Sequence, residues 1–345
     1  MAKNDSYYMQ LCLDLAMEGM GHVSPNPLVG CVIVRGDEVI GRGFHAQYGE
    51  AHAEVNAVAS LHPEQELNNS ALYVNLEPCS HHGKTPPCAD LIINTGISKV
   101  VYGMEDPNPL VAGKGLQKLR DAGIEVVGPV LPSECAMLNR RFIVNQQNQR
   151  PYIILKWAQS ADGYVDPPRT QSDQGIQWIT GDESQILTHH WRSEEDAILV
   201  GRKTVEVDNP LLTARRSEGT NPVRVVIDPT QQLNRIQYNV FNEEASTIVL
   251  AREGAADADV FVEAEGADWL LRQMQNLYKA GIGSILVEGG AATLHSFIEA
   301  NLWDEARVLT GNVTFAGGIK APVLSAQPVE EFQSGDDQIR VYSNL

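Results

Sequence analysis

Patterns typical of strands and helices alternate along this chain of 345 residues, and the alternation limits the folds that it can adopt. Residues 7–18 have apolar side chains at helical spacing, and two strand-like runs follow at 29–34 and 39–44 around a short polar turn. Further strands and helices follow one another as far as residue 300. This order predicts an α/β fold and, in the second half, a largely parallel sheet covered by helices on both faces.

A polar segment at residues 146–151 interrupts the alternation. It is poor in apolar side chains and ends in Pro151, which is typical of a boundary between domains. The chain is long enough for two domains of ordinary size. We therefore predict one domain over residues 1–147 and a second over residues 151–345.

Composition and charge argue against several classes of function. The net charge of −18 disfavours nucleic acid as a partner, although a small phosphorylated substrate needs only a few local cations. No apolar run of about 18 residues is present, which predicts no membrane span, and residues 1–5 lack the apolar core of a signal peptide. Five cysteines without a disulfide framework favour a reducing compartment, so we expect a cytoplasmic location.

His52, Cys79 and Cys88 have the residue types and the order of a zinc site. One imidazole and two thiolates provide three ligands for a tetrahedral ion and leave the fourth position open, as in a catalytic site. Glu54 is then free to carry protons beside the metal. Because residues two apart on a regular helix face different ways, His52 and Glu54 both reach the metal only from an irregular first turn.

Eight residues separate the two cysteines, and this insert contains His81, His82 and Lys84. Two other interpretations of the pattern remain open. In the first, Cys79 and Cys88 are ordinary small buried residues. In the second, His81 or His82 supplies a fourth protein ligand and the site is structural.

Further motifs surround the predicted zinc site. They are Ser-Pro-Asn-Pro-Leu-Val-Gly-Cys at 24–31, Gly-Phe-His at 43–45, His-Ala-Glu at 52–54, Glu-Pro-Cys-Ser-His-His-Gly-Lys-Thr-Pro-Pro-Cys at 77–88 and Asp-Pro-Asn-Pro at 106–109. Together they resemble the deaminase half of the bifunctional riboflavin biosynthesis deaminase/reductase family, over essentially all of residues 1–147. The long insert separates that family from cytidine, tRNA adenosine and deoxycytidylate deaminases. The resemblance implies a cytidine deaminase-like α/β/α fold.

The resemblance also implies roles for individual residues of the first domain. It makes His52, Cys79 and Cys88 the ligands of one Zn²⁺ and Glu54 the catalytic acid and base. For Asn26 and Asn108, turn formation beside proline is an alternative explanation that needs no ligand. The residues implied to bind the pyrimidine and its ribose phosphate are Asn26, His45, Lys84, Asp106 and Asn108.

The second domain lacks the Gly-x-Gly-x-x-Gly fingerprint of ordinary dinucleotide-binding domains. A predicted strand instead ends in Glu288-Gly289-Gly290 and leads into a helix, which lets backbone amides approach a pyrophosphate closely. Gly201-Arg202-Lys203-Thr204 follows another strand and offers two cations and a hydroxyl group for phosphate. These features suit NADPH, whose extra phosphate needs a cationic partner.

With the segments at 156–164, 177–180 and 201–215, these motifs resemble the reductase half of the same family, which has a dihydrofolate reductase-like α/β fold, over residues 151–345. The chain departs from the family pattern at Ile176, in the bulkier loop 158–162 and at Pro229. The resemblance implies that NADPH is bound by Gln159, Trp178, Thr204, Asp208, Gly290, Ala291, Ala292, Thr293, Leu294, His295 and Ser296. It implies that the reductase substrate is bound by Lys156, Ile176, Arg192, Leu212, Arg215 and Glu288.

Both halves together imply two consecutive reactions on a small phosphorylated pyrimidine. The first is zinc-dependent hydrolytic deamination of 2,5-diamino-6-(5-phosphoribosylamino)pyrimidin-4(3H)-one. The second is NADPH-dependent reduction of the ribosyl side chain of 5-amino-6-(5-phosphoribosylamino)uracil to ribityl. The resemblance favours a homodimer or a larger homo-oligomer. The alternative is a zinc nucleoside or nucleotide deaminase whose C-terminal domain binds a nucleotide without catalysis.

Overall fold

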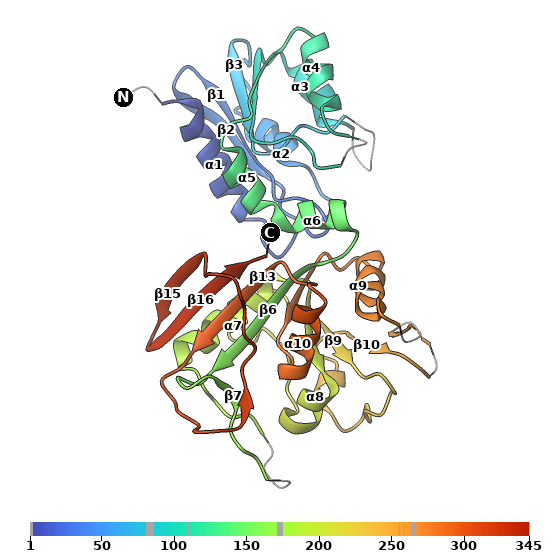
Figure 1. Cartoon of the computed structure of the whole chain (residues 1–345). Helices are drawn as coiled ribbons and strands as arrows, with labels where there is room; N and C mark the ends of the chain where they lie inside the picture. Colours follow the sequence, from blue (N-terminus) through green and yellow to red (C-terminus); the bar gives the residue numbers. More distant parts are fainter. Residues whose placement is uncertain are drawn as a thin grey trace. The chain divides into compact units, whose positions relative to one another are not determined.

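A computed structural model of the chain describes residues 3–80, 86–108, 111–170, 175–254, 256–257, 259–263 and 266–344. It divides into two compact units, Met1–Gln149 and Arg150–Leu345, which Figure 1 draws in blue to green and in green to red. Each unit has its own sheet and its own apolar cores, so the two are described separately.

The sheet of the first unit is mixed. Its strands are β1 (Gly30–Arg35), β2 (Glu38–Phe44), β3 (Ser70–Val74), β4 (Lys99–Tyr102) and β5 (Glu125–Val127). Their order across the sheet is β2-β1-β3-β4-β5. β1 is antiparallel to β2 and β3, whereas β3, β4 and β5 are parallel.

Helices cover both faces of this sheet. They are α1 (Asp5–Met17), α2 (Ala53–Ala59), α3 (Cys88–Thr95), α4 (Lys114–Asp121), α5 (Pro132–Leu138) and α6 (Arg140–Asn148). Cys31 and Ile33 of β1 pack on one face with residues of α2, α3 and α4. Val32 and Val34 point the other way and pack with α1 and α5, and both ribbon views show α1 lying along β1. The alternation of side chains along the strand therefore builds the predicted α/β/α layers.

The sequence of residues 135–147 predicts a single final helix for this unit, but the structure has two helices, α5 and α6, which meet at Asn139. The Asn139 side-chain oxygen accepts from the Leu28 N–H at 2.8 Å, and its amide donates to the Leu28 carbonyl at 3.1 Å. These bonds tie the junction to the loop before β1. The helical periodicity of the segment gave no indication of this break.

In the described residues of the second unit, nine strands form one sheet in the order β11-β10-β9-β8-β12-β6-β13-β16-β15. In this order, the strands from β11 to β13 are parallel to one another, which confirms the predicted largely parallel sheet. β16 and β15 add an antiparallel edge that the sequence patterns did not predict. β14 (Ile319–Lys320) and β7 (Tyr164–Asp166) form a separate pair. The nine strands are β6 (Tyr152–Gln159), β8 (Ala197–Gly201), β9 (Val223–Ile227), β10 (Thr247–Ala251), β11 (Val260–Val262), β12 (Ser284–Val287), β13 (Glu305–Thr310), β15 (Glu330–Ser334) and β16 (Asp337–Ser343).

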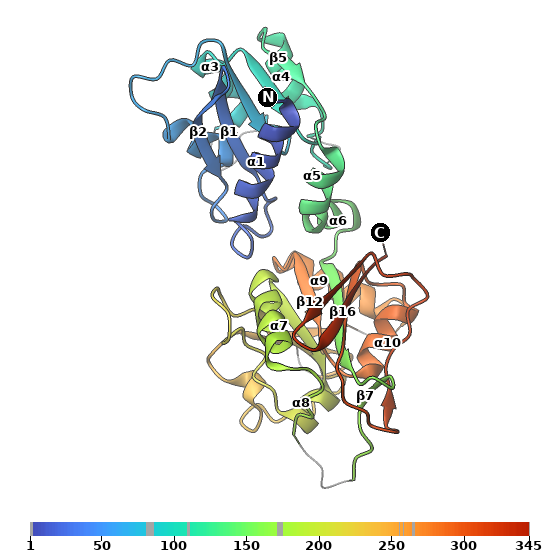
Figure 2. The same ribbon diagram turned by 90° about the vertical axis from the view of Figure 1, so that its left-hand side faces the viewer.

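Both faces of this sheet are also covered. The helices are α7 (Asp182–Glu194), α8 (Arg202–Asp208), the 3-10 helix η1 (Asn239–Phe241), α9 (Trp269–Lys279) and α10 (Ala291–Glu299). Ala197 and Leu199 of β8 pack with α9 and α10, whereas Ile198 and Val200 pack on the opposite face with Val205 of α8. Figure 2 shows α7 and α8 on one side of the sheet and α10 on the other. Among the helices of the described residues, none has the length and apolar character needed to cross a membrane.

Candidate active sites

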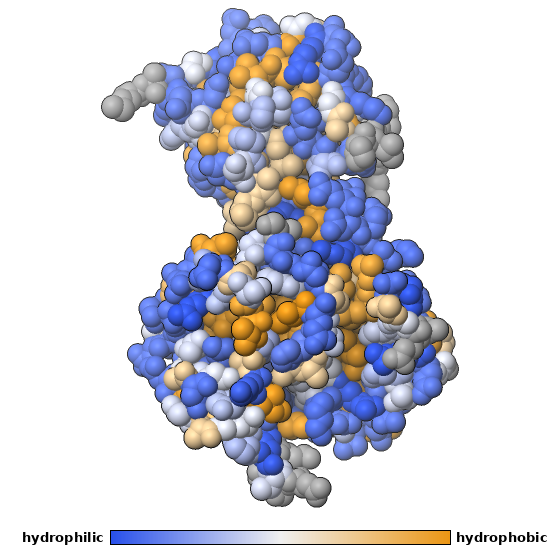
Figure 3. Space-filling model, in the orientation of Figure 1, coloured by the Kyte–Doolittle hydropathy of each residue, from blue (hydrophilic) through white to orange (hydrophobic). Residues whose placement is uncertain are grey.

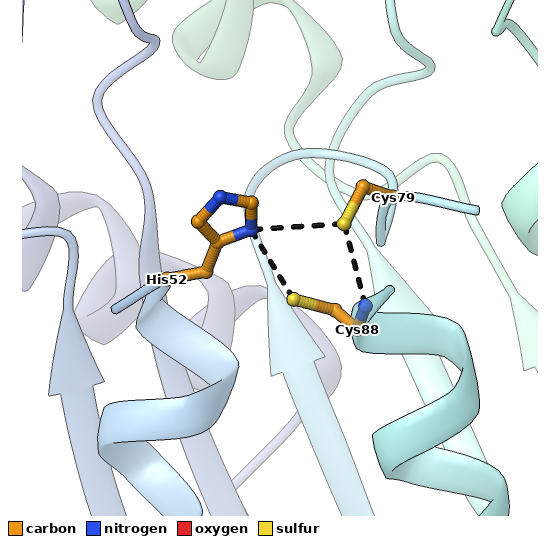
Figure 4. A group of neighbouring side chains, drawn as sticks. All are labelled: His52, Cys79 and Cys88. Carbon is orange, nitrogen blue, oxygen red and sulfur yellow. Dashed lines mark hydrogen bonds between the residues drawn. The ribbon is translucent and has the colours of Figure 1, made fainter. Parts of the chain in front are cut away.

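His52, Cys79 and Cys88 come together in the first unit, from three separate segments (Figure 4). His52 precedes α2, Cys79 follows β3, and Cys88 is the first residue of α3. The His52 Nδ1 atom lies 3.6 Å from Cys79 Sγ and 3.3 Å from Cys88 Sγ. Tetrahedral zinc with bonds of about 2.1 Å to nitrogen and 2.3 Å to sulfur separates these donor types by about 3.6 Å. The three side chains therefore fit one zinc ion.

The surroundings of the Cys79 sulfur favour a metal-bound thiolate. The Cys88 N–H, at the start of α3, lies 3.3 Å from Cys79 Sγ, and a helix N-terminus stabilises negative charge. A hydrogen bond from the Cys88 thiol, together with this N–H, lowers the pKa of the Cys79 thiol. His52, Cys79 and Cys88 are the one such group of potential ligands found among the described residues. His81 and His82, the alternative fourth ligands, lie outside those residues.

His52 and Glu54 both lie at the irregular start of α2, as their spacing requires if both are to reach a metal. His52 caps the helix with extended backbone (φ −71°, ψ 162°), and Glu54 lies in the first turn of α2. Glu54 is buried. Burial, with the charge of Cys79 adding to it, raises the pKa of the Glu54 carboxyl. A carboxyl group in this position can hold and release a proton within the pocket.

A pocket of about 260 Å³ opens beside these converging side chains. It is lined by His52, Glu54 and Cys79 and by the predicted substrate residues Asn26, His45, Asp106 and Asn108. The structure thus gathers residues from five segments of the first unit around one cavity. Lys84, the remaining predicted residue of this site, lies outside the described residues.

Hydrogen bonds define the orientation of His45 and Asn26. The His45 Nδ1 atom lies 3.0 Å from the Ala51 carbonyl, which can only accept, so Nδ1 carries the proton. Burial lowers the pKa of His45, which favours the neutral ring. Its Nε2 atom then accepts from the Asn26 amide at 3.0 Å. The Asn26 amide nitrogen is therefore engaged by His45, and its oxygen is the acceptor that can be offered to a ligand.

Two buried asparagines absent from the predicted site support this turn. Asn75 accepts from the Gly30 N–H at 2.8 Å and donates to the Leu28 carbonyl at 2.9 Å. Asn139 binds both backbone groups of Leu28, as described above. Because Leu28 follows the Pro-Asn-Pro turn directly, these bonds hold Asn26 at the pocket. A lone asparagine in a strand or helix pattern gives no local signal of such a role.

In the second unit, the predicted cofactor segments meet at one edge of the sheet. β8 and β12 are parallel neighbours, so Gly201, the last residue of β8, and Glu288, which follows β12, lie at adjacent strand ends. The Thr204 hydroxyl oxygen accepts from the Gly290 N–H at 3.0 Å. A Cβ atom on Gly289 would lie 2.5 Å from Val200 Cα, so only glycine allows this approach. The two segments that were predicted to bind phosphate are thus hydrogen-bonded to each other.

Lys156, Arg192 and Glu288, three of the predicted substrate residues, form one charged cluster. Arg192 donates to both Glu288 oxygens at 2.8 Å and to the Thr213 carbonyl at 3.0 Å. Lys156 Nζ lies 3.7 Å from Glu288. Burial opposes ionisation of Glu288, but Arg192 and Lys156 outweigh it and lower its pKa to about 2. Arg215, also predicted, is exposed and donates to the Thr213 hydroxyl at 3.4 Å.

His189 also lies beside this cluster, one turn before Arg192 on α7, and it was not among the predicted residues. It is buried, and its Nδ1 atom has no hydrogen-bond partner among the described residues. Burial and the nearby Arg192 and Arg215 cations lower the pKa of His189 to about 4, so the ring is neutral near pH 7. A histidine within a helical pattern gives no sequence signal of this position.

Other predicted reductase residues differ in their exposure. Ile176 and Trp178 are exposed, and Gln159 accepts from the Trp157 indole N–H at 3.0 Å. Asp208 lies 3.7 Å from Arg169, and burial raises its pKa to about 6. Leu212, in contrast, has its side chain in the apolar core.

The predicted residues of α10 separate into two groups. Gly290, Ala291, Ala292 and Thr293 form the helix start, which has no side-chain cap. The Leu294 side chain is in the core, and its N–H is bonded to the Gly290 carbonyl at 3.2 Å. The His295 and Ser296 side chains bond back to carbonyls of the first turn, at 2.7 and 3.0 Å. The backbone of the first turn is therefore the part of α10 best placed to bind an anion.

Arg202 and Lys203, the two cations considered for the NADPH phosphate, differ sharply. Arg202 donates to Thr230 at 3.0 Å, Gln232 at 2.9 Å and Asp228 at 3.4 Å, in the loop after β9. The Lys203 side chain is 84% exposed and lies 3.8 Å from Glu206. Arg202 thus lies among polar groups at the strand ends, and Lys203 extends into solvent.

Comparison with known proteins assigns the two units. The model of the cytidine and deoxycytidylate deaminase zinc-binding region matches residues 2–104, and that of the RibD C-terminal domain matches residues 151–340. Riboflavin biosynthesis protein RibD of Aquifex aeolicus is 38% identical over 335 residues, or 95% of this chain and 92% of that protein. A crystal structure of a diaminohydroxyphosphoribosylaminopyrimidine deaminase/5-amino-6-(5-phosphoribosylamino)uracil reductase from Thermotoga maritima is 35% identical, covers 98% of both chains and has a TM-score of 0.87. A structure of Acinetobacter baumannii RibD has 32% identity, the same coverage and a TM-score of 0.88.

The matched regions and the His-Cys-Cys site define a zinc-dependent deaminase joined to a reductase. The chain belongs to the RibD family of riboflavin biosynthesis proteins. It is a bifunctional enzyme that uses zinc for deamination and NADPH for reduction, and both predicted domain folds are confirmed. The match over the C-terminal domain supports this function over a deaminase with a non-catalytic second domain.

Proposed function

We propose that residues 1–147 carry out the deamination with His52, Cys79 and Cys88 as zinc ligands and Glu54 as the proton carrier. The observation that carries this proposal is the burial of Glu54 in the pocket that His52 and Cys79 also line. Bound zinc supplies Lewis acidity, which makes water a nucleophile near neutral pH. Glu54 would pass one proton of the attacking water to the ring nitrogen, and it would then pass the second proton of that water to the departing amino group, which leaves as ammonia.

The same pocket is proposed to bind the diaminopyrimidine phosphate substrate. Asn26, oriented by His45, offers an acceptor to the amino-bearing ring. Asp106 and Asn108 line the same pocket, and the Asn108 N–H donates to the Asp106 carboxylate at 2.8 Å. Lys84 is proposed as a phosphate partner on the family resemblance alone.

Residues 151–345 are proposed to bind NADPH and the deaminated product at the strand ends of the second sheet. NADPH supplies the hydride when bound. Thr204 and the start of α10 lie together there and suit a pyrophosphate. Lys156, Arg192 and Glu288 hold the substrate beside them, with Arg215 for its phosphate. Trp178, Asp208, Gln159, Ile176 and Leu212 remain proposed contacts on the resemblance.

Incubation with the diaminopyrimidine substrate, with and without NADPH, tests both activities at once. Ammonia release without NADPH reports deamination, and loss of NADPH absorbance reports reduction. We expect ammonia in both reactions and NADPH oxidation only after deamination. Ammonia release without any NADPH oxidation would contradict the proposed reductase site.

We also propose a homo-oligomer in the cytoplasm. Figure 3 shows hydrophobic residues at the surface of the second unit around β6 and β13, and Val323 and Val329 are among its exposed large apolar side chains. Such surfaces are often covered by a partner. All five cysteines are free, which suits a reducing compartment. Sedimentation analysis tests the assembly, and a monomer at micromolar concentration would contradict it.

A further inference from the structure

Glu77, two residues before the metal ligand Cys79, has a carboxylate that is saturated with backbone donors. The residue is 5% exposed. Its Oε1 atom accepts from the N–H groups of Gly115 at 2.8 Å and Leu116 at 3.4 Å. Its Oε2 atom accepts from Gly113 at 2.8 Å and Asp106 at 3.3 Å. One buried side chain thus binds four amides that lie 29 to 39 residues further along the chain.

Three of these amides belong to the start of α4, which has no side-chain cap of its own. Glu77 takes the place of that cap, and its negative charge suits the helix N-terminus. Two glycines make the arrangement possible. Gly113 has φ +76°, and a Cβ atom on Gly115 would overlap the Pro78 carbonyl.

The fourth amide, of Asp106, connects the carboxylate to the predicted substrate residues. With its backbone N–H bound by Glu77, Asp106 accepts from the Asn108 N–H at 2.8 Å. The Asn108 carbonyl in turn accepts from the N–H groups of Val111 and Ala112 at 2.9 Å. Glu77, Asp106, Asn108 and Val111 all line the pocket beside the zinc ligands.

We propose that Glu77 is a positioning residue for substrate binding by the deaminase. The Glu77 carboxylate bonds to the segment that carries Asp106 and Asn108, and the Glu77 backbone continues into the metal ligand Cys79. Glu77 therefore holds that segment at a defined distance from Cys79. This inference rests on the proposed role of Asp106 and Asn108 as substrate residues. A simple capping role would lower stability without altering the affinity for substrate.

The test is the variant Glu77→Gln in the full chain, because an amide presents only one acceptor oxygen and leaves two of the four N–H groups facing its NH₂ group. Zinc content, ammonia-release kinetics and reductase kinetics on deaminated substrate are measured together. We expect stoichiometric zinc, unchanged reductase kinetics and a KM for deamination raised about tenfold or more, with a smaller change in kcat. Glu105→Gln, at an exposed neighbouring carboxylate, is the matched control and should leave KM unchanged.

Asp106→Asn separates this inference from the proposed function. A raised KM in Asp106→Asn, with little further increase in the double variant, supports action of Glu77 through Asp106. An unchanged KM in Asp106→Asn refutes the substrate role of Asp106 and with it the inference. If Asp106→Asn raises KM but Glu77→Gln does not, or if Glu77→Gln loses zinc, only the inference is overturned.

If Glu77→Gln fails to fold, Gly113→Ala provides a second test, because it strains the same segment at the positive φ of Gly113. We expect this variant to raise KM, and an unchanged KM would overturn the inference.

Discussion

Arg192 and Glu288 form a two-point ion pair across 96 residues of sequence, with both nitrogen–oxygen distances at 2.8 Å. The pair joins α7 to the end of β12, and Lys156 lies 3.7 Å from the same carboxylate. Two cations therefore share one anion whose side chain is only 10% exposed. The excess positive charge suits a phosphorylated substrate. Glu288 is the anion that compensates part of the charge of Arg192 and Lys156.

Removal of that anion should destabilise the second unit. We expect Glu288→Gln to lower the free energy of unfolding by about 3 kcal/mol, because it leaves two largely buried cations uncompensated. All five tryptophans lie in the second unit, so urea unfolding followed by tryptophan fluorescence reports on that unit. Glu331→Gln, which breaks the exposed pair with Arg340, is the control and should cost less than about 1 kcal/mol. Equal effects of the two variants would contradict the cluster's contribution.

Acid should weaken the second unit through the same residue. The pKa of Glu288 is lowered to about 2 in the folded state from its ordinary value of 4.5. The unfolded chain therefore binds the proton more readily, so the stabilisation is complete above about pH 4.5 and is lost as the pH falls toward 2. Urea midpoints between pH 6 and pH 3 should fall more steeply for the wild type than for Glu288→Gln. Parallel curves would refute the linkage to Glu288.

Cys88→Ser should remove zinc and deaminase activity together, because the variant lacks one of the three converging donors. NADPH oxidation on deaminated substrate should persist, since that site lies in the other unit. Cys12→Ser, at a buried cysteine that bonds the Tyr73 carbonyl, is the control and should retain one zinc per chain. Metal analysis decides the point, and full zinc content in Cys88→Ser would exclude Cys88 as a ligand.

Glu54→Gln should keep zinc and fold but lose deamination by roughly a hundredfold or more, the usual contribution of a positioned acid and base. The amide has nearly the same shape and cannot carry the proton. Ammonia release is compared with zinc content in the same preparation. Stoichiometric loss of zinc would instead make Glu54 a ligand.

Cofactor choice should depend on Arg202 and not on Lys203. Arg202 lies among Thr230, Gln232 and Asp228 at the strand ends, whereas Lys203 is solvated. We expect the wild type to prefer NADPH over NADH roughly ten- to a hundredfold, as one or two charge-assisted bonds to phosphate would give. Steady-state kinetics with both cofactors should show that Arg202→Ala loses this preference and Lys203→Ala keeps it. The reverse result would assign the phosphate to Lys203, and equal use of NADH by the wild type would refute the preference itself.

The sequence by itself determined the zinc chemistry and most of the parallel strands of this protein. Ligand types, their order and the position of Glu54 are local features, and a buried parallel strand has an apolar run that stands out from its neighbours. The strands β7, β11 and β13 to β16 were missed. β7 and β11 are only three residues long, and β13 is buried but has Glu305 and Arg307 within its run. β15 and much of β16 are only partly buried and lack an apolar run. The helix break at Asn139 was missed because its cause, Leu28, lies 111 residues away.

Tertiary structure alone decided which polar groups meet. It paired Arg192 with Glu288, directed Arg202 rather than Lys203 toward the strand ends, and turned Leu212 and Leu294 into the core. The four donors that meet at Glu77 come from a segment that no spacing rule connects to it. The physical reason is that a motif specifies the chemistry a residue can perform, whereas its partners depend on which distant segments packing brings within the short range of a hydrogen bond.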